Sequence, residues 1–119
     1  MRGAVLALLL CGCMADEIEE ATETEDALCG PETPVVTWHT FGQGFVDTYC
    51  QGCHASTTVD RQGAPEIFAF DEASDVVAQA EAVLDATAPL EGEPRMPPNG
   101  GPSEEDRERL EIWLTCFTE

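Results

Sequence analysis

Apolar residues recur at helical spacing in three stretches of the chain, and each stretch predicts a helix. The first stretch holds Phe41, Phe45 and Tyr49. These residues fall four positions apart and therefore share one face of a helix, which runs into the segment YCQGCH at residues 49–54. We find no segment with the sustained alternation of a half-buried strand, so the pattern predicts an all-α domain.

The second and third predicted helices begin at residues that suit a helix start. Asp71 can cap a helix over residues 72–87, whose apolar side is formed by Val76, Val77, Ala80, Val83 and Leu84. Ser103 can cap the last helix, and the acidic residues that follow it place negative charge at the positive end of the helix dipole. The predicted buried stripe of this helix is Leu110, Trp113, Leu114 and Phe117.

The segments between these helices are predicted to be loops. Residues 57–70 contain the turn sequence Gly-Ala-Pro at residues 63–65, and residues 88–102 are rich in proline and glycine. Three helices of this size bury only a thin core. Such small domains often need a disulfide, a metal or a cofactor to be stable.

The charge of the chain is strongly acidic. It has 24 acidic and five basic residues, a formal net charge of -19, and no lysine. Such a surface repels nucleic acid, which we therefore exclude as a partner, and any charged protein partner is expected to be basic.

The first residues have the pattern of an export signal. Residues 4–10 form an apolar run, which is much shorter than the about 20 residues that cross a bilayer. The ending LCGC at residues 10–13 resembles a bacterial lipoprotein box, in which the cysteine is acylated. Cys13 is the better candidate and Cys11 the alternative, and an ordinary cleaved signal is the competing interpretation. Lipidation would anchor the protein at the periplasmic face of a bacterial membrane, with inner or outer membrane left open.

We therefore expect three regions: a lipoprotein-type signal peptide at residues 1–12, an acidic tether at residues 13–34 and a folded domain at residues 35–119. The acidic run at residues 16–26 has too few apolar residues to pack. Cys29 and Cys116 remain after the signal and the Cys-x-x-Cys pair are set aside. An exported compartment permits a disulfide between them, and two unpaired thiols are the alternative.

The chemistry of the chain is concentrated in Cys50, Cys53 and His54. A structural zinc site usually has four ligands in two pairs, and no second pair is left here. A thioredoxin-like redox pair follows a strand and begins a helix, whereas this pair ends a predicted helix. Cys-x-x-Cys-His is the attachment pattern of c-type haem: both thiols can add to haem vinyl groups, and the histidine binds the iron. We therefore predict one covalent haem c.

Met96 is the predicted sixth ligand of the iron. It lies in a proline-stiffened loop rather than on an apolar helix face, and a thioether ligand raises the reduction potential. His39 is the alternative ligand. Arg95 could pair with a haem propionate or be an exposed loop charge, and Trp38 could hydrogen-bond a propionate or only pack.

From about Trp38 to Phe117 the chain resembles a monohaem class I cytochrome c. The resemblance implies a small cytochrome c-like fold with about three main helices around the haem. It implies that Gly44 and Phe45 meet Leu110 and Trp113 where the first and last helices cross. It further implies that the Pro65 carbonyl accepts the second ring N–H of His54 and orients the imidazole.

The function that follows is a monomeric carrier of single electrons between redox partner proteins. Since both axial positions are predicted to be filled by His54 and Met96, the iron has no open site, which argues against an enzyme. The alternative is a haem-based sensor or small-ligand-binding lipoprotein in which Met96 dissociates, and a peroxidase or oxidase subunit is disfavoured. The lysine ring of mitochondrial-type members is absent, so their partner specificity does not carry over.

Overall fold

The computed structural model describes residues 27–118, and these residues form helices and loops without a strand. The predicted all-α class is therefore confirmed for this part of the chain. The predicted signal peptide at residues 1–12, with Cys11, and the lipidation candidate Cys13 lie outside the described residues.

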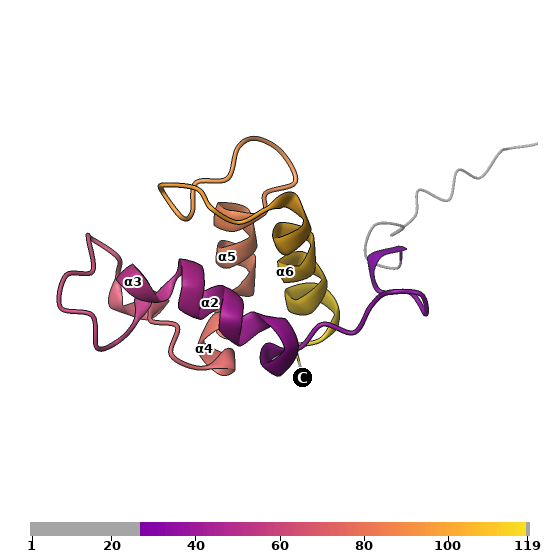
Figure 1. The fold of residues 1–119 in the computed structure, drawn as a ribbon, viewed down its shortest axis with the longest axis horizontal. Coiled ribbons are helices and arrows are strands. Elements are labelled where there is room, and N and C mark those ends of the chain that lie inside the picture. The colour runs from indigo at the N-terminus through magenta and orange to yellow at the C-terminus, as the bar shows by residue number, and fades with distance from the viewer. Residues whose placement is uncertain (1–26, 119) are drawn as a thin grey trace, which may run out of the picture.

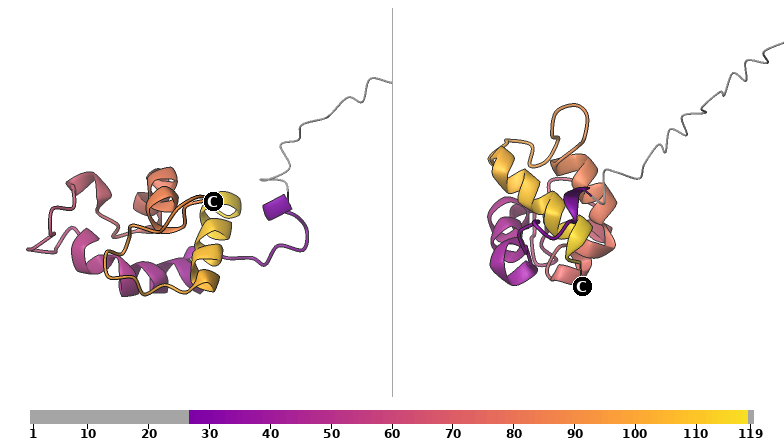
Figure 2. Two further views of the ribbon diagram at one scale, coloured as in Figure 1. Left: turned by 90° about the horizontal axis from the view of Figure 1, so that it is seen from above. Right: turned by 90° about the vertical axis from the view of Figure 1, so that its right-hand side faces the viewer.

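The helical elements are η1 (Trp38–Gly42, a π-helix), α2 (Gln43–Tyr49), α3 (Gln51–His54), η2 (Glu66–Phe68, a 3-10 helix), α4 (Ala73–Ala78), α5 (Ala80–Thr87) and α6 (Glu104–Cys116). In Figure 1, α2 leads directly into α3, while α5 and α6 lie side by side and are joined by the long loop of residues 88–103. α6 also packs against η1 (Figure 2), so the beginning and the end of the domain meet.

The first helical segment begins at Trp38, three residues before the apolar pattern predicted. Thr37 forms a capping box with Thr40: the Thr37 side chain accepts from the Thr40 N–H, and the Thr40 side chain accepts from the Thr37 N–H. These bonds satisfy backbone donors that a helix start otherwise leaves free. The predicted apolar face is confirmed, since the ring of Phe45 lies 5.4 Å from that of Phe41 and 5.1 Å from that of Tyr49.

The second predicted helix is interrupted at Gln79, which separates α4 from α5 and has φ -115° and ψ 21°. The apolar spacing gave no sign of this break, because the apolar residues on both sides of it still pack against one core. The cap also differs from the prediction. Glu72 and Asp75 form the capping box of α4, and Asp71 is engaged with the segment after the Cys-x-x-Cys-His sequence.

α6 begins as predicted, with the Ser103 hydroxyl accepting from the Asp106 N–H at 3.1 Å. The predicted stripe is buried at Leu110, Trp113 and Leu114, whereas Phe117 is half-buried. Ile112, which the stripe did not include, is also buried. The core formed by α6 and its neighbours consists of Val36, Phe45, Val46, Phe70, Val76, Leu110, Ile112, Trp113 and Leu114.

The glycine that lies at the crossing of the first and last helices is Gly42. The prediction that Gly44 contacts the last helix there is wrong. A Cβ atom on Gly42 would lie 2.9 Å from two carbons of the Trp113 ring, whereas one on Gly44 would meet nothing within 4 Å. Gly42 is buried and Gly44 is exposed. Because the helical segment starts earlier than predicted and contains a π-helix, the face that contacts α6 includes Gly42. Phe45 is buried in the same core, as predicted.

Cys29 and Cys116 form a disulfide with their Cα atoms 5.4 Å apart, which confirms the predicted pairing. The bond joins the end of α6 to residues that were assigned to the acidic tether. Leu28 packs against the core beside it, so the contacts of the domain extend at least to this residue. In the loop-entropy account, a link across 87 residues stabilises the fold by roughly 4–5 kcal/mol.

The two neighbouring glycines provide a matched test of the helix crossing. Gly42→Ala is expected to lower the free energy of unfolding by about 1–3 kcal/mol, because the new methyl group overlaps the Trp113 ring. Gly44→Ala is expected to be neutral or to stabilise by up to about 1 kcal/mol, because alanine is the better helix former. Urea unfolding monitored by circular dichroism measures both, and equal changes would contradict the close approach at Gly42.

Candidate haem-attachment site

The end of α2 and the single turn of α3 place Cys50, Cys53 and His54 together. The Cys50 N–H closes α2 by donating to Val46 O at 2.9 Å, and Cys50 O then accepts from the N–H groups of Cys53 and His54 at 3.2 and 2.9 Å. Both thiols are free and half-buried. Two thiols and an imidazole are thus carried by one helical turn.

The imidazole of His54 is held in a defined orientation. Its Nδ1 lies 2.7 Å from the carbonyl oxygen of Phe68, and its ring stacks on Phe70 with the centroids 5.0 Å apart. A carbonyl oxygen can only accept, so Nδ1 carries the proton and donates it. This tautomer leaves Nε2 as the nitrogen that can bind a metal ion, the usual arrangement for a ligating histidine.

The carbonyl that orients His54 is that of Phe68 and not, as predicted, that of Pro65. Pro65 O accepts instead from the Arg61 guanidinium at 2.9 Å and from the Phe68 N–H at 3.0 Å. Arg61 also donates to the carbonyl oxygens of Ala55 and Ala64. Arg61 therefore fixes the loop at Pro65, and η2 brings the Phe68 carbonyl to the ring.

A short segment after η2 runs along the Cys-x-x-Cys-His turn and is bonded to it repeatedly. The Gln51 side chain donates to Phe70 O at 2.6 Å, and the Phe70 N–H donates to His54 O at 2.6 Å. The Ser56 N–H donates to Asp71 Oδ1 at 3.0 Å. Hydrogen bonds from Ser56 hold the pKa of Asp71 below its usual value; the side-chain bond has the larger effect and the backbone bond the smaller. No sequence pattern indicates these contacts, because most of the bonds use backbone groups, which every residue has.

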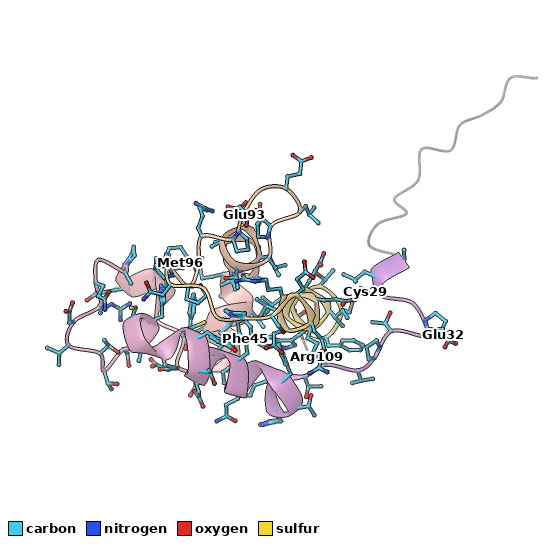
Figure 3. All side chains as sticks on the ribbon, turned by 45° about the horizontal axis from the view of Figure 1, so that its top comes forward. Cys29, Glu32, Phe45, Glu93, Met96 and Arg109 are labelled. Atoms are coloured by element: carbon cyan, nitrogen blue, oxygen red, sulfur yellow. A yellow bond between two sulfur atoms is a disulfide. The ribbon has the colours of Figure 1, made fainter. Side chains whose placement is uncertain are left out.

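Met96 lies on the loop between α5 and α6; in Figure 3 it is to the left of these helices, whereas Cys29 is to the right of α6. The N–H groups of Arg95 and Met96 both donate to Ala86 O, at 2.8 and 2.9 Å, which fastens the loop to the last turn of α5. The Met96 residue is 40 % exposed. Farther along the loop, a Cβ atom on Gly101 would lie 3.0 Å from the Tyr49 ring, so the loop returns beside the residue that precedes Cys50.

The other candidate residues have ordinary structural contacts. Arg95 forms an ion pair of 2.5 Å with Asp85, and both side chains are largely exposed. Trp38 packs against Trp113, with the ring centroids 5.7 Å apart. The alternative ligand His39 is exposed.

The free thiols of Cys50 and Cys53 and the imidazole of His54 are the groups to which a c-type haem attaches. Residues 27–118 contain no group of three or more His, Cys, Asp or Glu side chains arranged to hold a metal ion. A c-type haem attaches through two thiols to its vinyl groups and through one imidazole to its iron; the sixth ligand differs between proteins and can be a thioether. Cys50, Cys53, His54 and Met96 supply these groups. Two cavities of about 400 and 510 Å³ lie elsewhere, the first beside Trp113 and the second between residues 27–34 and α6, so the fit rests on the donor set.

Burial raises the pKa of the Cys50 thiol from 9.0 to about 11, because the thiolate would lose hydration. In a haem-free Cys53→Ala chain at about pH 8, the thiolate fraction of Cys50 should therefore be about a hundredfold below that of an ordinary thiol. Its alkylation by iodoacetamide, followed by mass spectrometry, should accelerate with pH up to about 11. The same chain unfolded in urea serves as the control, and its alkylation rate should rise with pH around the pKa of an ordinary thiol. A midpoint near 9 in the folded chain would contradict the burial of this thiol.

None of the helices in the described part of the chain is long and apolar enough to span a membrane. Comparison of the whole sequence with protein-family models, with curated proteins and with solved structures finds no match. The functional interpretation therefore depends on the chemistry of the residues that this chain brings together.

Proposed function

We propose that this chain is an exported monohaem c-type cytochrome that carries single electrons, with a small cytochrome c-like fold around one covalent haem. The observation that carries the proposal is that the α3 turn brings together two free thiols and a histidine of defined tautomer. Two free thiols lie beside a histidine whose Nδ1 is bonded to Phe68 O, which leaves Nε2 free to bind a metal.

Each residue of the proposed site has a distinct role. The thiols of Cys50 and Cys53 would hold the haem through thioether bonds, and His54 Nε2 and the Met96 sulfur would bind its iron. When bound, haem supplies the Fe(III)/Fe(II) couple. A histidine and methionine pair raises the reduction potential of that couple. Since the protein fills both axial positions, the proposed role is transfer of electrons rather than catalysis on a substrate.

The proposed cellular setting follows from the N-terminal sequence and the charge. A lipid on Cys13 would anchor the protein at the periplasmic face of a bacterial membrane, where c-type haem is attached. The net charge of -19 favours a redox partner with a basic docking surface. The acidic run at residues 16–26 would let an anchored, monomeric domain reach such partners.

The test of the proposal is expression of the chain with cytochrome c maturation machinery. We expect an alkaline pyridine haemochrome spectrum of the c type and colour that stays on the chain in a denaturing gel. Cys50→Ala with Cys53→Ala should abolish both signals, because no thioether can form. His39→Ala, a change at the other histidine, should leave both intact. A colourless wild-type chain under these conditions would overturn the proposal.

The second candidate function is a haem-based sensor, and the exposure of Met96 favours it. A ligand that is 40 % exposed lies near solvent and is more easily replaced by a small molecule than a buried one.

Carbon monoxide binding to the reduced protein separates the carrier from the sensor. For the carrier we expect little binding at neutral pH, since Met96 occupies the sixth position, and strong binding in Met96→Ala, which serves as the positive control. Rapid binding to the wild-type protein would instead favour the sensor. The measurement is the shift of the haem absorption band under carbon monoxide.

A further inference from the structure

Arg107, on the first half of α6, contacts the loop that carries Met96. We propose that Arg107 is a positioning residue whose guanidinium holds this loop in the arrangement that lets Met96 bind iron. This inference rests on the proposed function and adds to it a determinant of the sixth ligand that lies outside the Cys-x-x-Cys-His turn and the methionine loop.

The contacts of Arg107 are with backbone carbonyl groups at both ends of one chain segment. Its Nη1 donates to the carbonyl oxygen of Thr87, the last residue of α5. The same nitrogen lies 3.4 Å from the carbonyl oxygen of Met96. Residues 88–95 are therefore enclosed between two positions that a single side chain touches.

These contacts complete the end of α5. The last carbonyl groups of a helix have no partner within the helix and form the negative end of its dipole. Here Ala86 O accepts from the N–H groups of Arg95 and Met96, and Thr87 O accepts from Arg107. A cationic donor at this end forms a hydrogen bond with the carbonyl oxygen and interacts favourably with the negative end of the helix dipole. The base of the loop and the end of α5 are therefore held together.

The chain offers many carboxylates with which an arginine could pair, so it is informative that Arg107 donates to carbonyl oxygens instead. Of the four arginines in the described residues, two form surface ion pairs, Arg95 with Asp85 and Arg109 with Glu105, and two, Arg61 and Arg107, donate to carbonyl oxygens. Arg107 lies one residue after Asp106 and one before Glu108, yet its hydrogen bonds go to carbonyl groups. It is half-buried, whereas the Arg109 side chain is 49 % exposed. Arg107 is thus directed toward the loop and not toward a neighbouring carboxylate.

The rigidity of α6 explains why an arginine at this place can act on Met96. α6 is fixed in the core by Leu110 and Trp113, which are 0 % and 2 % exposed. In the part of the loop near Arg107, the large apolar side chains Leu90 and Met96 are both exposed and give it little anchorage. Arg107 therefore links the loop to a helix that is held in the core. Loss of this link should favour dissociation of Met96 from the iron, although no ligand has been removed.

The experiment compares Arg107→Gln with the matched surface variant Arg109→Gln and with Arg107→Lys, all as haem-loaded proteins. A hydrogen bond from a charged donor is worth a factor of about ten or more in an equilibrium. We expect the Met96-dissociated form to increase about tenfold or more in Arg107→Gln. This change appears as carbon monoxide binding and as a weaker near-infrared sulfur-to-iron charge-transfer band. Arg109→Gln should behave as wild type. Arg107→Lys should lie between wild type and Arg107→Gln, since it keeps the charge but carries its donor on a shorter side chain without the planar guanidinium.

Amide hydrogen exchange provides a readout that does not depend on the iron. The N–H groups of Arg95 and Met96 should exchange about tenfold faster in Arg107→Gln than in Arg109→Gln, while the amides in the middle of α6 should be unchanged. If the wild-type chain attaches no haem, the proposed function fails, and the exchange measurement on that chain still decides whether Arg107 holds the loop. Equal exchange and equal carbon monoxide binding in the two glutamine variants would overturn the inference.

Discussion

The close contact between the Gly42 backbone and the Trp113 ring sets the arrangement of the domain. It allows η1 and α6 to approach more closely than any side chain at residue 42 would permit. The first helical segment continues from this contact through α2 to the α3 turn, while α6 runs from the same region back to the methionine loop. The proposed histidine ligand is therefore carried by the first helical segment and the proposed methionine ligand by the loop before α6, and these two segments meet at the crossing. A small shift at the crossing would move them relative to each other.

Backbone carbonyl groups, more than side chains, hold the two ends of the candidate site. On the histidine side, Arg61 binds three carbonyl oxygens and Phe68 O orients the ring. On the methionine side, Ala86 O and Thr87 O fix the base of the loop. In a chain so rich in carboxylates, two of its few cations are bonded to carbonyl groups at the ends of this site. Each loop is thereby tied to a helical element.

The sequence predicted the features that depend on periodicity and on residue chemistry. Helical spacing and the Ser103 cap located α6, and cysteine counting located the Cys29–Cys116 bond. It missed features that depend on backbone position. The π-helix moved the crossing from Gly44 to Gly42, and η2 exchanged Pro65 for Phe68 as the partner of His54, because any residue can supply a carbonyl oxygen. The break at Gln79 was missed for a similar reason: apolar spacing is the same on both sides of it.

The Cys29–Cys116 bond also decides how the domain would respond to a pull from its N-terminal side. Force applied to the chain before Cys29 reaches the domain both through the backbone at residue 30 and, through the disulfide, at the end of α6. The load is therefore shared between two connections to the domain, and residue 29 cannot move away from the end of α6 unless the disulfide is broken. In Figure 3, Met96 lies to the left of α5 and α6 and Cys29 lies to the right of α6, so a domain tethered through its N-terminal side would hold the methionine loop away from the point of attachment.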